Sequence, residues 1–154
     1  MKLVRYGPAG QEKPGMIDAD GQLRDLSGQV SDISGEVLSD AGLAKLAALD
    51  PASLPAVDGS PRFGPCVGQT SKILCIGLNY SDHAAETGAE PPMEPIVFAK
   101  ALNALCGPND DVEMPRNSQA LDWEVELAVV IGTKAKYVSE ADAMNHVAGF
   151  AVMN

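Results

Sequence analysis

The sequence predicts an α+β fold that is mainly β, with a small N-terminal domain followed by a strand-rich second domain. Short β-like runs and one helical stretch open the chain, and a linker rich in proline and glycine follows them. The second half carries a long run of alternating and then continuously apolar residues, which is typical of a strand. With 154 residues, 45% of them hydrophobic, the chain can form one soluble globular domain or two small ones.

The N-terminal domain is expected to begin with a hairpin or a small meander. Residues 3–6 and 15–18 have the composition of strands, and the Asp-Gly pair within residues 19–22 predicts a tight turn. A helix is expected over residues 40–49, where apolar residues recur at helical spacing and Ser39 can cap the first turn. The Asp-Pro pair that follows should end this helix.

A connector over residues 51–70 separates the two expected domains, because proline, glycine and small polar residues dominate it. We therefore expect a small N-terminal α/β domain with its connector over residues 1–70, and a second domain over residues 71–154. The expected elements of the second domain are strands at 72–77, 95–100, 121–132 and 147–154, and helix starts at 79–81 and 139.

Composition excludes several classes of partner. Eleven lysines and arginines stand against 21 aspartates and glutamates, so the formal net charge is -10 and no basic surface is available for nucleic acid. No apolar run is long enough to span a bilayer, and the first residues lack the apolar core of a signal peptide. The expected protein binds neither nucleic acid nor membrane and stays in the cytoplasm.

The three cysteines are not expected to form disulfides or a zinc site. Cys66, Cys75 and Cys106 are odd in number, and their spacing matches no zinc pattern. Cys75 lies in an apolar run and is expected to be a passive core thiol.

Two glutamates are the first candidates for chemistry. Within residues 121–132 the two-residue period of a strand places Glu124 and Glu126 on one face, with Cα atoms roughly 6.5–7 Å apart. Two carboxylates at this distance can share a hard divalent cation, Mg²⁺ or Mn²⁺. The alternative is a solvated face, but the apolar residues after Glu126 favour a central strand over an exposed edge.

A histidine and a glutamate are the second candidates. His83 and Glu86 are three residues apart on the expected helix, so a carboxylate lies beside an imidazole, as a base that activates water requires. The alternative is an ordinary histidine on a helix surface. Lys100 ends an apolar strand and can either meet a ligand or extend into water, whereas His146 is expected to be structural. Nucleotide-binding glycine motifs and the serine hydrolase elbow are absent from the sequence.

Three ordered motifs resemble the fumarylacetoacetate hydrolase family: residues 76–86, 95–100 and 122–132. The resemblance covers residues 72–154, and residues 1–70 resemble the small leading domain of bacterial two-domain members. Among these, the sequence is most similar to hydrolases of 2,4-diketo-3-deoxy sugar acids such as the rhamnonate and fuconate derivatives. Similar sequences are also labelled ureidoglycolate lyase.

The resemblance implies a role for each candidate residue. Glu124 and Glu126 match the family's metal-binding glutamates, His83 and Glu86 match its water-activating pair, and Lys100 matches a lysine near the substrate. It also implies Mg²⁺ or Mn²⁺ in a catalytic domain built as a mixed β-sheet roll, commonly in a homodimer. The implied substrate is a small 2-keto or 2,4-diketo acid, and the reaction is metal-dependent hydrolysis of a carbon–carbon bond.

The family pattern extends past the last residue of the chain. Its third metal-binding carboxylate, an aspartate, follows the asparagine that matches Asn154, so we expect only the first half of the catalytic domain here. The chain is then a fragment, or a partner segment completes it. Two alternatives stay open: a lyase, decarboxylase or isomerase of the same family, and a non-catalytic module that assembles with another chain.

Overall fold

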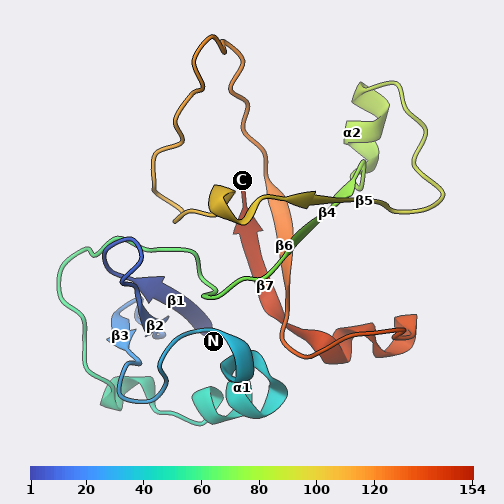
Figure 1. The fold of residues 1–154 in the computed structure, drawn as a ribbon. Coiled ribbons are helices and arrows are strands. Elements are labelled where there is room, and N and C mark those ends of the chain that lie inside the picture. The colour runs from blue at the N-terminus through green and yellow to red at the C-terminus, as the bar shows by residue number, and fades with distance from the viewer. The chain divides into compact units, whose positions relative to one another are not determined.

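The computed structural model describes residues 1–154 and combines short helices with small antiparallel β-sheets (Figure 1). The chain packs into two compact units. One unit joins Met1–Gln69 to Cys106–Asn154, and the other is the intervening segment Thr70–Leu105. These units follow spatial packing, and the division into residues 1–70 and 71–154 stays a prediction.

The first unit begins with a three-stranded sheet of β1 (Lys2–Tyr6), β2 (Lys13–Ile17) and β3 (Leu23–Asp25), in that order. The Asp18 carboxylate closes the turn between β2 and β3 by accepting the backbone N–H groups of residues 20 and 22. Gly21 sits at φ +83° in this turn, a conformation that glycine adopts without a steric cost. The turn expected at the Asp-Gly pair is confirmed, and of the two expected arrangements the structure has the meander.

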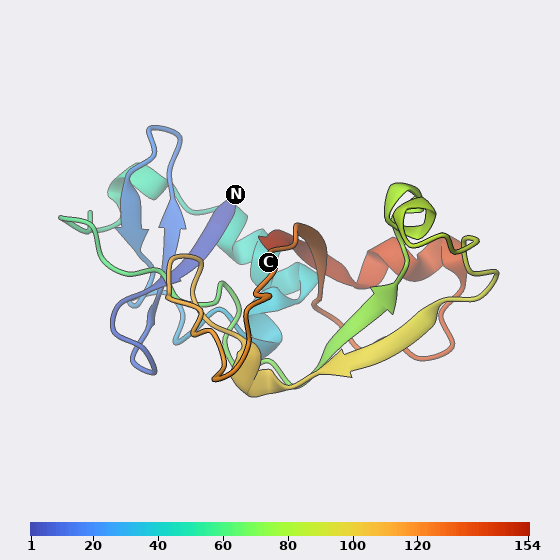
Figure 2. The same cartoon turned by 90° about the horizontal axis from the view of Figure 1, so that it is seen from above.

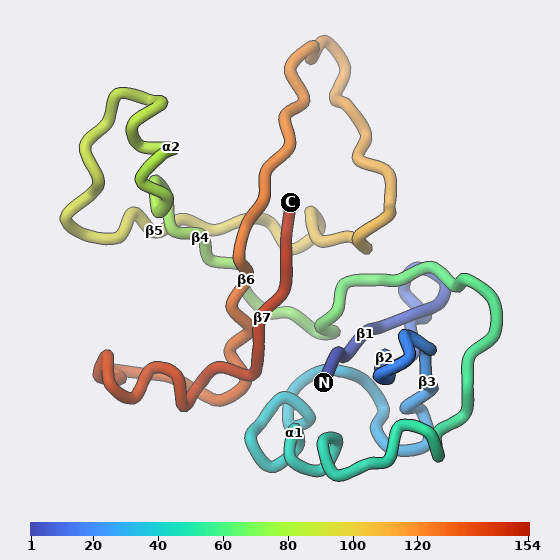
Figure 3. The backbone as a smooth tube through the Cα atoms, turned by 180° about the vertical axis from the view of Figure 1, so that it is seen from behind, coloured from blue at the N-terminus to red at the C-terminus, as the bar shows by residue number.

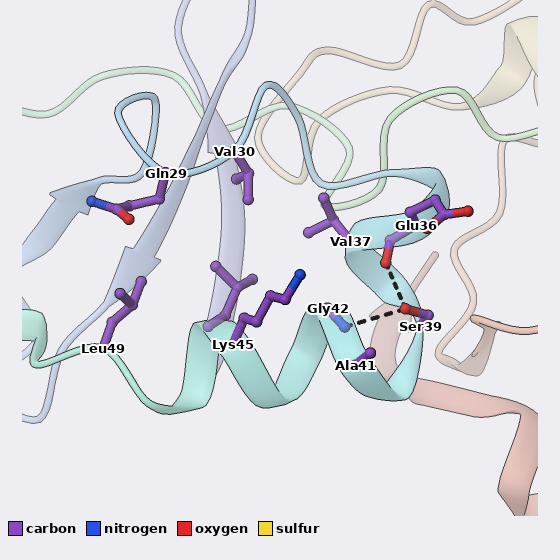
Figure 4. A pocket seen from close by; sticks show the side chains of 10 residues that line it. Gln29, Val30, Glu36, Val37, Ser39, Ala41, Gly42, Lys45 and Leu49 are labelled. Carbon is purple, nitrogen blue, oxygen red and sulfur yellow. Dashed lines mark hydrogen bonds between the residues drawn. The ribbon is translucent and has the colours of Figure 1, made fainter.

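Helix α1 (Asp40–Ala47) has the cap that the sequence predicts: the Ser39 hydroxyl oxygen accepts the Gly42 N–H at 3.2 Å (Figure 4). The 3₁₀ turn η1 (Gly35–Leu38) leads into the helix, and Gly42 packs so closely on it that a Cβ there would collide with the Glu36 carbonyl oxygen. A pocket of about 330 Å³ lies beside this region, and Figure 4 shows Val30, Val37 and Lys45 among the side chains that line it. A second 3₁₀ turn, η2 (Pro51–Ser53), follows the helix.

The hydrophobic core of the first unit lies under these elements. Leu26 and Ile33 are fully buried at its centre. The remaining buried members are Met16, Leu38, Leu46 and Leu54. Val130 and Ala148, which come from the last part of the chain, pack against the same cluster.

The last two strands, β6 (Glu126–Ile131) and β7 (Val147–Met153), form an antiparallel pair that runs side by side in Figures 1 and 3. Between them lies the 3₁₀ helix η4 (Glu140–His146), which Ser139 caps by accepting the Asp142 N–H. The helix start predicted at residue 139 is therefore correct in place, although the helix is not α-helical.

Two expectations for the strongest strand are wrong. The strand predicted over residues 121–132 begins only at Glu126, and β6 pairs with β7 alone instead of lying at the centre of a sheet. Leu127, Val129 and Ile131 are exposed on one of its faces. A continuous apolar run signals burial on both faces, but within this chain only the other face has a core to pack against.

The segment Thr70–Leu105 is a hairpin of β4 (Ile73–Gly77) and β5 (Ile96–Lys100), which Figure 2 shows as two adjacent arrows. Between the strands lies the short helix α2 (Ser81–Glu86), and the 3₁₀ turn η3 (Leu102–Ala104) follows β5. The predicted strands and helix of this segment are confirmed. No helix of the structure is long and apolar enough to cross a bilayer.

Replacing Leu26 with alanine should lower the free energy of unfolding by about 2–5 kcal/mol, because it leaves a cavity in the core of the first unit. Urea unfolding followed by circular dichroism measures the loss. The matched control is Val152→Ala, at a side chain that is 81% exposed, and it should change the value by less than about 0.5 kcal/mol. Equal losses in the two variants would contradict the location of the core.

Alkaline pH should weaken the fold through Tyr6. Burial, followed by the hydrogen bond to Asp25 and the charge of that carboxylate, raises the pKa of Tyr6 to about 12. The stability from this raised pKa is complete below the unfolded pKa of about 10 and is lost as the pH rises toward 12. Unfolding free energies measured from pH 9 to 11 should therefore fall less steeply in Tyr6→Phe than in the parent chain. The same slope in both, or an equal change in the control Tyr137→Phe, would contradict this origin.

Candidate active site

His83 and Glu86 lie on α2, which follows a strained turn. β4 ends at Gly77, and Leu78 then adopts φ +50°, a left-handed conformation that costs a residue with a side chain about 1–3 kcal/mol. The N-cap of α2 is Tyr80, inside the range 79–81 where the helix start is expected, and its side chain makes no capping hydrogen bond. Sequence reasoning missed Leu78, because no propensity marks leucine for this conformation.

The His83 and Glu86 side chains are both exposed and lie about one helical turn apart. Ala84 between them is fully buried and fixes which face of α2 packs inward. The Asp82 carboxylate accepts the backbone N–H of His83 at 3.0 Å, and the Thr87 hydroxyl donates to the His83 carbonyl oxygen at 3.2 Å. The helix therefore holds an imidazole and the Glu86 carboxylate open to solvent, one turn apart.

Lys100 is exposed at the opposite end of the same hairpin. In the β4–β5 register Lys100 pairs with Ile73, whereas Ile96 pairs with Gly77, the residue that leads toward α2. Four residues of strand span about 13 Å, so Lys100 does not lie beside the strand end from which α2 starts.

Glu124 and Glu126 lie at the beginning of β6. Glu126 is the first residue of the strand, and Glu124 precedes it in extended chain. The Glu124 backbone N–H donates to the Asn154 side-chain oxygen at 2.6 Å, which keeps this approach next to the end of β7. Both glutamates are exposed. Asn154 is a second residue that sequence reasoning missed as a positioning group, since a contact across 30 residues leaves no local pattern.

The donor set suits a hard cation in kind but not in number. Glu124 and Glu126 offer carboxylate oxygens, which Mg²⁺ and Mn²⁺ prefer over nitrogen or sulfur ligands. The structure contains no group of three or more histidine, cysteine, aspartate or glutamate residues arranged to hold a metal ion. The chain thus supplies two carboxylates of a site whose other ligands would be water, substrate or a further segment.

The candidate residues are divided between the two compact units. His83, Glu86 and Lys100 belong to the segment Thr70–Leu105, and Glu124 and Glu126 belong to the other unit.

The cysteines are free, and burial raises the pKa of the Cys66 thiol, which makes it a poor nucleophile.

Comparison with known proteins assigns the region that contains the candidate residues to a protein family. Residues 72–154 match the C-terminal domain of the fumarylacetoacetate hydrolase family, and this range contains all five candidate residues. Two solved structures share the fold. A fumarylacetoacetate hydrolase from Exiguobacterium antarcticum has a TM-score of 0.73 and 27% identity, over 99% of this chain and 54% of that one. A protein from Mycobacterium smegmatis, provisionally described as HpcE, has a TM-score of 0.74 and 28% identity, over 99% and 53%.

More similar sequences come from Burkholderia. Proteins of Burkholderia multivorans and Burkholderia ambifaria that carry the provisional name hydrolase are each 60% identical over 154 residues. The match covers 100% of this chain and 55% of each relative, so the chain spans about half the length of the curated relatives it matches. The profile match over more than half of the chain shows that it belongs to the fumarylacetoacetate hydrolase family.

Proposed function

We propose that this chain carries the first half of the active site of a metal-dependent hydrolase, which cleaves a carbon–carbon bond in a 2,4-diketo acid of the acylpyruvate type. One observation carries the proposal. A solvent-open His83–Glu86 pair and two glutamates at the start of β6 all fall in the region that matches the family. Water activation and metal binding by carboxylates together are what such a hydrolysis needs.

His83 is the proposed general base. An imidazole nitrogen takes a proton from water, and the Glu86 carboxylate lies one turn away on the same helix. Lys100 offers an ammonium group to the substrate carboxylate. We assign it binding and not proton transfer, because it lies at the far end of the hairpin from the start of α2.

Glu124 and Glu126 would hold the cation, with Mg²⁺ and Mn²⁺ as the candidates. When bound, the cation would polarise the adjacent oxygens of the diketo acid. The Asn154 side chain supports this role by fixing the backbone at Glu124. A homodimer in the cytoplasm that recognises a small diketo acid, and neither nucleic acid nor membrane, completes the proposal.

Two other assignments remain candidates. A ureidoglycolate lyase, or a decarboxylase or isomerase of 2-keto dicarboxylic acids, would use the same residues, and the reaction product distinguishes them. A non-catalytic module that assembles with another chain is favoured by the exposed apolar residues of β6 and β7 and by the presence of only two candidate metal ligands.

Manganese should raise the melting temperature of the chain, because a ligand that binds only the folded state stabilises it by mass action. Glu124→Gln should abolish the shift, since it replaces a charged ligand with a neutral amide. The matched control is Glu113→Gln, at an exposed glutamate of the loop before β6, and it should keep the shift. A shift that persists in Glu124→Gln, or its absence from the parent chain, counts against the metal site and for the assembly module.

On a panel of acylpyruvates, loss of the enol absorbance should report hydrolysis. His83→Ala should lower kcat by about 10²–10⁴-fold, the usual contribution of a general base, with a small effect on KM. His146→Ala is the control for loss of an imidazole. The hydrogen-bond partner of the His146 ring is the Thr133 hydroxyl, which lies outside the candidate site. A full rate in His83→Ala would remove it as the base, and keto acid products with an intact carbon–carbon bond would favour the isomerase.

A further inference from the structure

The chain leaves the first unit after residue 69, forms the segment Thr70–Leu105, and re-enters the first unit at residue 106. Arg62 before the segment and Asp110 after it are 48 residues apart, yet they form a two-pronged ion pair. The Nε–Oδ1 distance is 2.6 Å and the Nη2–Oδ2 distance is 2.5 Å. A guanidinium and a carboxylate in this fork geometry resist rotation as well as separation.

The outgoing chain, residues 62–68, is fixed along the first unit by backbone hydrogen bonds. The Gly7 N–H donates to the Arg62 carbonyl oxygen, and the Gly64 N–H donates to the Arg5 carbonyl oxygen, each at 2.9 Å. The Gly68 N–H donates to a carbonyl of the core loop at the same distance. This stretch therefore cannot shift without breaking main-chain contacts with β1.

The returning chain, residues 106–110, lies directly on the outgoing chain. A Cβ added at Gly107 would collide with the Phe63 carbonyl oxygen, so only glycine fits at this crossing. The Gly107 N–H also donates to the Asp110 carboxylate at 2.6 Å, beside its bonds with Arg62. We call residues 62–68 and 106–110 the neck.

Five side chains of alternating charge form a row of ion pairs at the neck. In order along the row they are Asp110, Arg62, Glu12, Arg5 and Asp32. Glu12 is 6% exposed in its side chain and accepts from Arg62 at 2.9 Å. Burial alone would raise the pKa of Glu12, but the hydrogen bond from Arg62 and the backbone bonds lower it. Loss of Arg62 would leave this carboxylate buried with only the more distant Arg5 as a cation.

We propose that the neck is a positioning device for the reaction, in which Arg62 and Asp110 clamp the two ends of the segment that carries His83. This proposal rests on the proposed function, since it assigns the clamp to the same site. With the clamp closed the two chain ends that lead into the segment are held together; with it open they are two separate tethers. A base held by loose tethers spends less time in reacting geometry, so kcat falls before substrate affinity does.

Hydrogen exchange tests the clamp without reference to activity. In Arg62→Gln and Asp110→Asn we expect several-fold faster exchange at the N–H groups of Gly64, Gly68 and Gly107. The control is Arg24→Gln, which breaks the Arg24–Asp18 ion pair of 2.8 Å within the same unit and should leave these amides unchanged. Unchanged exchange in the neck, or a uniform rise across the first unit, would overturn the proposal.

A second pair of variants covers the case in which loss of a charge unfolds the chain. Gly107→Ala forces a methyl group against Phe63 and should open the neck with no change of charge, whereas Gly28→Ala meets no atom within 4 Å and should do nothing. Gly107→Ala should lower kcat several-fold while the manganese shift is kept, because Glu124 and Glu126 are untouched. An unaltered kcat in a variant whose neck exchanges faster would overturn the positioning role. If the parent chain is inactive on every diketo acid, the proposed function is overturned instead. The hydrogen-exchange rates at the neck would still test whether Arg62 and Asp110 act as a clamp.

Discussion

The packing of the last two strands on the N-terminal core is the constraint on which the position of Glu126 depends. The N-terminal sheet and α1 form a unit that is not finished at residue 69, because part of its core comes from β6 and β7. Val130 and Ala148 supply that part, so the strand that starts with Glu126 is anchored on the N-terminal core. The small N-terminal region is therefore a support for the metal-binding candidates and not an appendage.

Much of the local structure could be predicted because its causes are local. The Ser39 cap needs only a hydroxyl before an apolar helical pattern, and the turn at Gly21 needs only the Asp-Gly pair. The hairpin of β4 and β5 follows from two short apolar runs. His83 and Glu86 could be placed on one helix face for the same reason, since helical spacing alone brings them together.

The rest depends on contacts that spacing does not encode. The alternating run at residues 121–132 predicted a central strand, but a strand's neighbours are set by the whole topology, and β6 has only β7 beside it. The ion pair of Arg62 with Asp110 joins residues 48 apart in two glycine-containing loops, where nothing periodic marks either partner. The spacing of the two glutamates indicated a hard divalent cation, whereas the substrate came from the family resemblance alone, and the roles of the five site residues stay predictions.

The net charge of the chain gives a further reason for the roles proposed for Lys100 and for a cation at Glu124 and Glu126. A diketo acid is an anion, and a chain with a formal charge of -10 repels anions on average. Binding then requires positive charge placed locally, where it acts at short range and is least screened by salt. Arg5 and Arg62 cannot supply it, because they are already paired with buried or half-buried carboxylates. Lys100 is exposed and has no such partner among the ion pairs, and a divalent cation held by Glu124 and Glu126 would cancel their two negative charges. With a metal bound, the two glutamates would no longer add to the repulsion, and the cation would offer coordination to the oxygens of the substrate.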